Sequence, residues 1–277
     1  MTGNLYIVST PIGNMADISY RAVTVLNEVD LILAEDTRVS LKLLNHYKIS
    51  KPLVSCHKFN EKARSIILSK ILTHNHNLAL ISDAGTPLIS DPGYEIIKAA
   101  LNLNINPIII PGPVALIAAI SISGFRAEKF VFLGFLPKKN SQALSLLSKF
   151  TDTGLPIIIY IPTNKVIDTL EMIKAHLGNV MACLAKEITK IHETYFRGSI
   201  NDILLSLNEE NVRGEFVLVI QPDTLNNNDN SQNIDQFINM ARNENLSPKT
   251  ILNMLMALFP QACKNGLYQK ILDFDID

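Results

Sequence analysis

A polar loop at Ser82–Gly93 carries two aspartates, two glycines, two prolines and two serines between an apolar run and a segment of helical period. A plain connection between a strand and a helix needs about two to six residues, so the extra length indicates a binding role. Asp83 directly follows the apolar run, where no helix requires a cap, and is expected to contact a ligand. Asp91 is expected to cap the helix that starts near Gly93.

Three further loops have the same character, and each directly follows a short apolar run. They are Ser9–Asn14, Glu35–Arg38 and Pro111–Ala115. In open α/β sheets, ligands bind in the crevice outside the carboxyl ends of the strands. Four unusual loops in this position predict a binding crevice along one edge of one sheet.

Each loop also has an ordinary structural interpretation. Residues 9–14 could form a turn, because proline, glycine and asparagine dominate turns for steric reasons. Asp36 or, preferably, Thr37 could cap the next helix, although capping does not explain the acidic residues and the arginine of Glu35–Arg38 together. Three glycines allow either a positive φ or a close approach to a ligand, and the sequence does not separate these uses: Gly85, Gly93 and Gly112.

Signatures of several common site types are missing from the sequence. No G-x-G-x-x-G follows the first apolar run, and there is no G-x-x-x-x-G-K-[ST], which argues against dinucleotide and P-loop sites. The cysteines are far apart, at Cys56, Cys183 and Cys263, so neither a metal site nor a redox pair is expected. His74 and His76 lie in a polar stretch and are expected to form a solvated turn. No metal cofactor is predicted.

The composition is that of a cytoplasmic protein of two domains. The chain has 277 residues, of which 47% are hydrophobic, and a formal net charge of −1. An anionic partner would therefore be met by local basic patches rather than by a global field. No apolar run approaches the roughly 20 residues of a membrane helix, and no signal peptide is recognisable, so no membrane partner is expected.

Hydrophobic periodicity predicts the elements that position the loops. Short apolar runs alternate with segments of helical period along the chain, which indicates a largely parallel α/β sheet. In a first domain, 1–112, strands are expected at Leu5–Val8, Leu31–Ala34, Leu53–Val54, Leu78–Ile81 and Pro107–Ile110, and helices at Tyr20–Glu28, through Leu41 and Tyr47, at Glu61–Leu72 and at Tyr94–Leu101.

A second α/β domain is predicted at 113–222, after a helix of small residues at Val114–Ser123. A polar linker follows at Asp223–Asn233, and then a helical module at 234–277, in which Ser247 and Pro248 are expected to start the middle helix. The strands of the second domain are predicted at Phe130–Leu133, Pro156–Ile161, Val180–Leu184, Glu193–Phe196 and Phe216–Ile220, and its helices at Ala143–Phe150, Lys165–Leu177 and Asn201–Leu207.

Several segments resemble one known family. They are LYIVSTPIGNMADISYRAVTVLNEVDLILAEDTR, ISDAGTPLISDPGYEII, PGPVALIAAISISGF, FLGFLPKK, AKEITKIHETYFRGSI and RGEFVLVI. They are similar to the bacterial 16S rRNA ribose methyltransferase I family of the tetrapyrrole-methylase superfamily. The resemblance is collinear from Leu5 to Pro137 and continues to the C-terminus. It implies two α/β domains with a cleft between them, a small C-terminal helical module and a homodimer.

The resemblance also implies a reaction, the transfer of methyl from S-adenosylmethionine to the 2′-hydroxyl of a cytidine in the decoding centre of the small ribosomal subunit. In-line methyl transfer depends mainly on orientation, and it needs neither a metal nor an enzyme nucleophile. By analogy, the donor-binding residues are Ser9, Pro11, Ile12, Asp83, Ala84, Gly85, Thr86, Pro87, Leu88, Ile89, Pro111, Gly112, Pro113, Val114 and Ala115.

A ribose hydroxyl is a poor nucleophile, so a general base or a cation that stabilises the alkoxide would help. The candidates are Glu35, Asp36, Arg38, Lys186 and Glu187, and the sequence does not choose among them. This chain departs from the family pattern at Tyr160–Lys165, where Ile161 and Lys165 replace a glutamate and an arginine, and at Ala143 and Leu144, where paired arginines are usual.

Binding to 16S rRNA requires phosphate contacts from basic side chains. The candidates are Lys138, Lys139, Lys186, Lys190, Arg197 and Arg213, with Arg242, Lys249, Lys264 and Lys270 near the C-terminus. Two other functions stay open. One is methylation of a small corrinoid or tetrapyrrole by the same fold. The other is a catalytically degenerate ribosome-binding protein, which only the departure at Tyr160–Lys165 supports.

Overall fold

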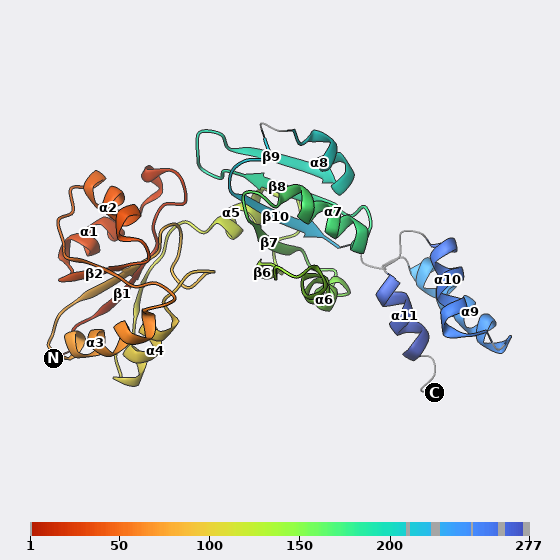
Figure 1. Ribbon diagram of the computed structural model, residues 1–277, viewed down its shortest axis with the longest axis horizontal. Helices are drawn as coiled ribbons and strands as arrows, with labels where there is room; N and C mark the ends of the chain where they lie inside the picture. The colour runs from red at the N-terminus through yellow and green to blue at the C-terminus, as the bar shows by residue number, and fades with distance from the viewer. Residues whose placement is uncertain (1, 209–210, 223–227, 245, 260–263, 274–277) are drawn as a thin grey trace. The chain divides into compact units, whose positions relative to one another are not determined.

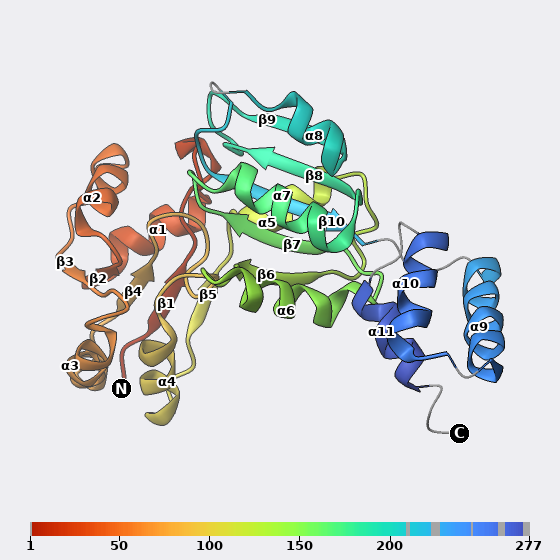
Figure 2. The ribbon, with the colours of Figure 1, turned by 45° about the vertical axis from the view of Figure 1, so that its right-hand side comes forward.

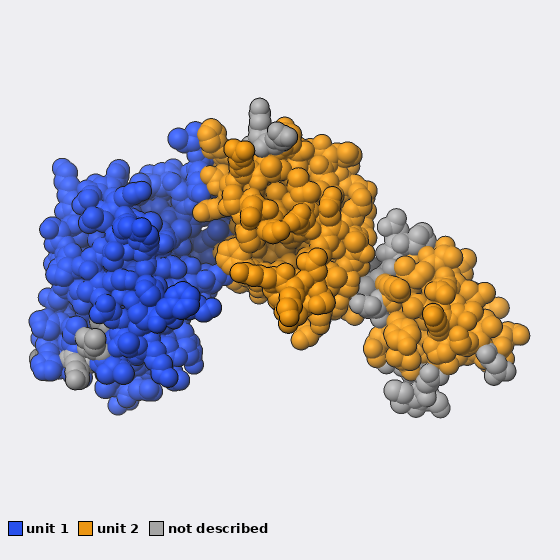
Figure 3. Space-filling model, in the orientation of Figure 1, with its two compact units in different colours: residues 1–118, 188–191 blue, residues 119–187, 192–277 orange. Residues whose placement is uncertain are grey.

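The computed structural model describes residues 2–208, 211–222, 228–244, 246–259 and 264–273. The chain divides into two compact units, which Figure 3 shows in two colours. Unit 1 contains Met1–Ala118 together with the short segment Ile188–Ile191, and unit 2 contains Ala119–Glu187 and His192–Asp277. Each unit has its own sheet.

Unit 1 is built on a five-stranded sheet in the order β3-β2-β4-β1-β5. All of its strand pairs are parallel, so every carboxyl end lies at the same edge, and the prediction that four unusual loops leave one edge is confirmed. The strands are β1 (Leu5–Val8), β2 (Leu31–Ala34), β3 (Leu53–Ser55), β4 (Leu78–Ile81) and β5 (Ile108–Ile110).

Helices cover both faces of this sheet (Figure 1). Helices α1 and α2 contribute Leu26 and Leu44 to the core on one face, and α3 and α4 contribute Leu72 and Ile96 to the core on the other. The helical segments are η1 (Met15–Asp17), α1 (Tyr20–Glu28), α2 (Thr37–His46), α3 (Glu61–Thr73) and α4 (Tyr94–Asn102), and α5 (Ala115–Ile122) contains the boundary between the two units.

The strand order contains a topological switch point between β1 and β4. The chain leaves β1 towards β2 on one side, whereas it leaves β4 towards β5 on the other. In open α/β sheets, ligands bind outside the carboxyl ends of the strands at such a point. The loops after β1 and β4 are Ser9–Asn14 and Ser82–Gly93, two of the four predicted from sequence.

Unit 2 has a five-stranded sheet in the order β6-β7-β10-β8-β9. Only β6 and β7 are parallel, whereas β10 runs antiparallel to both of its neighbours and β8 pairs antiparallel with β9. The expectation of a largely parallel sheet is therefore wrong for this unit, because β10 inserts between β7 and β8 in the reverse direction. Its elements are β6 (Val131–Phe135), α6 (Asn140–Thr151), β7 (Ile157–Ile161), α7 (Val166–Leu177), β8 (Met181–Lys186), β9 (Thr194–Ser199), α8 (Ile200–Ser206) and β10 (Phe216–Gln221).

Three C-terminal helices pack around a core of their own, which contains Ile238, Ile251 and Leu267. They are α9 (Asn228–Asn243), α10 (Pro248–Leu258) and α11 (Lys264–Asp273), shown in blue in Figures 1 and 2. Ser247 caps α10 by accepting a hydrogen bond from the Thr250 N–H, with proline at the first helical turn, which confirms that predicted start.

Helix α9 begins earlier than expected. The polar stretch 223–233 was predicted to be a linker, but α9 starts at Asn228, and 223–227 lie outside the described residues. A terminal helical turn needs no apolar residue, because packing further along the helix supplies its stability. Among the helices of the described part of the chain, none is long and apolar enough to cross a membrane.

Candidate functional site

The loops after β1 and β4 are joined by hydrogen bonds. The Thr10 N–H donates to the Gly85 carbonyl at 2.8 Å, and the Gly85 N–H donates back to Thr10 at 3.1 Å. The Ser9 and Thr86 hydroxyls lie 2.7 Å apart, and the Thr10 hydroxyl donates to the Ser82 carbonyl at 3.1 Å. Ser9 and Thr10 are buried, so they support the Ser82–Gly93 loop from within the fold.

The structure assigns a packing role to two of the glycines whose use the sequence left open. A Cβ on Gly112 would lie 2.8 Å from the Ser9 Cβ, and one on Gly93 would lie 2.9 Å from the Leu80 Cδ2. Gly93 and Gly85 also have φ values of 139° and 82°, which other residues rarely adopt. These glycines let neighbouring segments approach and let the backbone turn, and neither use requires a ligand.

The remaining loop residues predicted to bind the donor differ in exposure. Ala84, Ile89, Pro111 and Gly112 are exposed, whereas Pro87 is buried. The other members are half-buried, and they are Pro11, Ile12, Thr86, Leu88, Pro113, Val114 and Ala115. Leu88 packs against the core beneath α4 despite its φ of 75°, which is an outlier for a bulky side chain.

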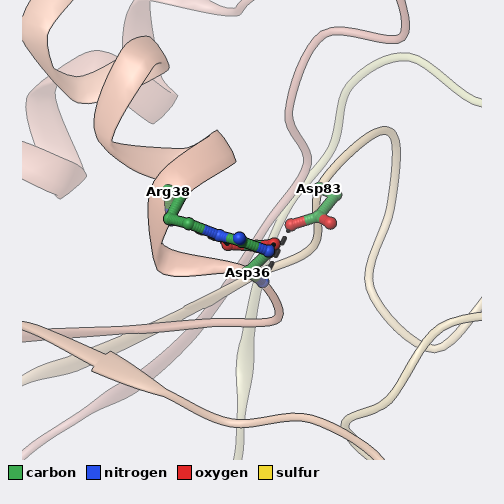
Figure 4. A network of polar contacts seen from close by, with 3 residues as sticks. All are labelled: Asp36, Arg38 and Asp83. Carbon is green, nitrogen blue, oxygen red and sulfur yellow. Dashed lines mark hydrogen bonds and ion pairs between the residues drawn. The ribbon is translucent and has the colours of Figure 1, made fainter.

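Asp83 links the loop after β4 to the loop after β2, as Figure 4 shows. Its Oδ1 accepts a hydrogen bond from the Asp36 N–H at 2.9 Å. Asp36 caps α2 by accepting from the Arg38 N–H, and its carboxylate also receives the Arg38 Nε at 3.1 Å and Nη2 at 2.6 Å. The preference for Thr37 as the cap is therefore wrong, because Thr37 is already the first helical residue.

Four carboxyl groups at this edge fall into two electrostatic classes. Hydrogen bonds from Arg38 lower the pKa of Asp36 to about 2. Burial, reinforced by the neighbouring carboxylates, raises the pKa of Glu35 and Asp83 and brings that of Asp91 to about 7. Partial burial and neighbouring like charges both disfavour the ionised form of a carboxyl group.

Asp91 is not the cap of α4, which corrects the sequence prediction. The helix starts at Tyr94, and the residue before it, Gly93, has no side chain with which to cap it. Glu61 from α3 performs this function, because its Oε1 accepts the Gly93 N–H at 2.9 Å and the Glu95 N–H at 2.6 Å. Asp91 instead lies near the Ser82 side chain, which lowers its pKa slightly against the larger effect of burial. The role of Glu61 as a cap could not be predicted from the sequence, because Glu61 lies 32 residues from Gly93.

Residues 188–191 pack against the loop after β1 within unit 1. The Asn14 N–H donates to the Thr189 Oγ1 at 3.1 Å. A Cβ on Gly13 would lie 2.8 Å from the same oxygen and 3.0 Å from the Ile188 carbonyl. Gly13, which the sequence explained as a turn residue, therefore also makes room for a segment 175 residues away.

The two remaining catalytic candidates, Lys186 and Glu187, belong to unit 2. Lys186 ends β8 and is buried. The Glu187 Oε1 accepts the Glu215 N–H at 2.7 Å, and the Glu187 N–H donates to the Glu215 carbonyl at 2.9 Å. Glu187 thus has a structural partner in Glu215, directly before the start of β10, whereas Glu35, Asp36 and Arg38 lie together beside Asp83 in unit 1.

Several basic residues predicted to contact RNA have partners inside the fold. Arg197 donates two hydrogen bonds to the Ile122 carbonyl, Arg242 donates to the Ile271 carbonyl, and Lys270 pairs with Asp235 at 2.8 Å. Lys190 is half-buried. The exposed candidates are Lys138, Lys139, Arg213, Lys249 and Lys264, together with Arg197 despite its hydrogen bond to Ile122. Over the residues that the structure describes, no group of three or more ligating side chains is placed to hold a metal ion.

Comparison with solved structures identifies the fold. The crystal structure of the methyltransferase CobJ has a TM-score of 0.59 at 14% identity and covers 80% of this chain and 95% of its own. The crystal structure of diphthine synthase has a TM-score of 0.64 at 12% identity, and the match covers 80% of this chain and 91% of that structure's chain. A family model described as Tetrapyrrole (Corrin/Porphyrin) Methylases matches residues 4–204.

Comparison with curated proteins narrows the family. A Haemophilus influenzae protein is 39% identical over 274 residues, which are 97% of this chain and 96% of that protein. A Synechocystis protein is 44% identical over 79% of this chain and 78% of its own length, and a Thermotoga maritima protein is 39% identical over 79% and 98%. All three are named ribosomal RNA small subunit methyltransferase I, and this chain belongs to that family within the tetrapyrrole methylases.

Proposed function

We propose that this protein transfers a methyl group from S-adenosylmethionine to the 2′-hydroxyl of a cytidine in the decoding centre of 16S rRNA, acting as a cytoplasmic homodimer. The observation that carries the proposal is the match to a named rRNA methyltransferase over 97% of this chain and 96% of the relative. The solved structures of the methyltransferase CobJ and of diphthine synthase share 14% identity or less with this chain and support the fold alone.

The carboxyl edge of the unit 1 sheet fits a cationic donor. When bound, S-adenosylmethionine supplies an electrophilic methyl on a positively charged sulfur. Glu35, Asp83 and Asp91 place three carboxyl groups with raised pKa at this edge, and a nearby positive charge would stabilise their ionised forms. The donor-binding segments of the proposal are the Asp83–Ile89 and Pro111–Ala115 loops, with Ser9–Ile12 supporting them.

Two of the proposed proton acceptors differ in the direction of their pKa shift. A general base works best when its pKa lies near the working pH. Asp36, with a pKa of about 2 and both oxygens engaged by Arg38, is poorly suited. Glu35, whose pKa burial raises, is better suited. The Arg38 side chain is 89% exposed, with Asp36 as its ion-pair partner, and it stays a candidate for stabilising the alkoxide. Lys186 and Glu187 remain candidates from unit 2.

Transfer of labelled methyl to small ribosomal subunits that lack the modification tests the proposal. We expect label on one cytidine ribose of 16S rRNA, mapped by nuclease digestion and mass spectrometry. Label on a base or on a tetrapyrrole would refute the proposal. Absence of transfer together with absence of donor binding in calorimetry would favour a degenerate ribosome-binding protein.

A further inference from the structure

Three aromatic side chains share one face at the end of β6 and β7 because β6 contains an irregularity. Phe132 pairs with Ile158, but Gly134, not Leu133, pairs with Ile159, so Leu133 is an extra residue. Gly134 accommodates this bulge with a φ of 62°. Without the extra residue, Phe132 and Phe135 would face opposite sides of the sheet. Bulges of this kind re-aim side chains.

The face that these aromatic rings occupy is the one opposite the main core of unit 2. Ile159 and Ile161 of β7 belong to that core, and Tyr160 between them faces the other way. Tyr160 packs edge-to-face against Phe132, with ring centroids 5.0 Å apart, and against Phe135, with centroids 5.5 Å apart. These contacts fix the orientation of the Phe135 ring.

Phe135 remains 54% exposed although it is held in this cluster. It is the last residue of β6, an edge strand of the sheet (Figure 2). Lys138 and Lys139 follow it closely and are both exposed. An exposed aromatic ring held by its neighbours and followed within four residues by two exposed lysines is suited to single-stranded nucleic acids, because bases stack on aromatic rings and phosphates pair with cationic side chains.

We propose that Phe135, supported by Tyr160 and flanked by Lys138 and Lys139, stacks against an unpaired base of the RNA substrate. This inference rests on the proposed function and adds a substrate-binding surface in unit 2. An unpaired RNA segment fits better than a duplex, because the bases of a duplex are stacked within the helix and A-form grooves are recognised through shape and backbone. It also fits better than an apolar protein partner, because the two lysines offer charge complementarity to phosphate.

The chain contains no tryptophan, so Phe135→Trp would introduce a single fluorophore at the proposed contact. We expect single-stranded oligoadenylate of about ten nucleotides, within the usual site size, to quench its fluorescence. S-Adenosylmethionine alone should leave the emission unchanged. Quenching by the donor alone would assign the ring to the donor's adenine instead and overturn the proposal.

A matched pair of alanine variants tests the contribution to binding. Phe135→Ala should raise the KM for small subunits roughly 5- to 100-fold, the usual effect of removing one stacking contact, with unchanged donor affinity. Phe59→Ala removes a ring that is 94% exposed in unit 1 and should leave both quantities unchanged. Equal effects of the two variants, or a change of oligomeric state in sedimentation with Phe135→Ala alone, would overturn the proposal.

The lysines provide an independent measurement. Lys138→Ala and Lys139→Ala should each reduce the slope of log affinity against log salt for oligoadenylate by about 0.7. An unchanged slope in both variants would contradict their contact with phosphate. Failure of the wild-type enzyme to methylate small subunits would refute the proposed function instead, since the fluorescence and salt measurements need no turnover.

Discussion

The two sheets use polar side chains differently at the points where strands meet helices. In unit 1, α4 is capped by Glu61 from another helix, and the loop before α2 is fixed by Asp83 from another strand end. In unit 2, α8 is capped by its own first turn, in which Ser199 and Asp202 form a reciprocal capping box. Long-range contacts thus organise one edge of unit 1, whereas local contacts suffice at α8.

Strand direction explains this difference. Parallel strands bring several loops, each separated by a helix in sequence, to one edge of the sheet. Polar groups in those loops can therefore satisfy one another over long sequence distances, such as the 47 residues between Asp36 and Asp83. In the antiparallel part of unit 2, β8 and β9 adjoin in sequence and in the sheet. The candidate site in unit 1 therefore depends on residues that are remote in sequence.

The largest expected effect comes from breaking the link between the loops after β4 and β2. Asp83→Ala removes a carboxylate from the proposed donor site and the acceptor of the Asp36 N–H. Hydrogen bonds to charged groups contribute about 1.5–3 kcal/mol, so donor affinity measured by calorimetry should fall roughly 10- to 100-fold. Asp83→Asn keeps an oxygen that can accept the Asp36 N–H, so its donor affinity should fall less.

The control for this prediction is Glu28→Ala, which removes an exposed carboxylate at the end of α1. We expect its donor affinity to equal that of the wild type. A folded Asp83→Ala protein with wild-type donor affinity would remove Asp83 from the proposed site and leave it only its structural link to Asp36.

The second prediction concerns pH, because Asp91 has a folded-state pKa of about 7 against an ordinary value of 3.8. Between these values the folded state binds more protons than the unfolded state, so this carboxyl lowers the free energy of unfolding as the pH rises from about 4 to about 7. Asp91→Asn removes this pH-dependent decrease in the free energy of unfolding. With about 1.4 kcal/mol per pKa unit, the free energy of unfolding of the variant should rise by about 2.5 kcal/mol relative to that of the wild type between pH 5 and pH 8.

Urea denaturation at several pH values measures this effect. Part of the pH dependence should remain in Asp91→Asn, because burial also raises the pKa of Glu35 and Asp83. The control is Asp168→Asn, which changes an exposed aspartate paired with Lys165 in unit 2. Parallel wild-type and Asp91→Asn curves would show that Asp91 ionises in the folded protein as it does in the unfolded chain.

Most elements could be predicted from the sequence, because they depend on local pattern. Tyr20–Glu28 and Leu78–Ile81 have the bounds that periodicity and apolar runs predict. The four loops at one edge also followed from order along the chain. The direction of β10 did not, because an apolar run does not reveal which neighbours it pairs with or in which direction.

The partners within the site could not be predicted, because they depend on tertiary contacts. The unusual composition of the loop drew attention to Asp83 and Asp91. The cap of α4 was predicted to be Asp91, the acidic residue nearer in sequence, and not Glu61. It likewise gave no indication that Thr189 meets Gly13. The sequence shows that a glycine is present, but it does not show which distant segment packs against that glycine.

The smallest expected effect is the difference in stability between removing a helix cap that is remote in sequence and removing a local one. Glu61 is buried and accepts two N–H groups at the start of α4, so Glu61→Ala leaves both donors without this partner and should cost about 2 kcal/mol. Ser199→Ala removes a local cap in a half-exposed turn and should cost about 1 kcal/mol. The expected difference in the free energy of unfolding is thus about 1 kcal/mol.

Glu61→Ala should also weaken donor binding, because the Ser82–Gly93 loop ends where Glu61 holds the backbone, whereas Ser199→Ala should not. Equal losses of stability with unchanged donor affinity would show that the remote cap of α4 does no more for the candidate site than a local one.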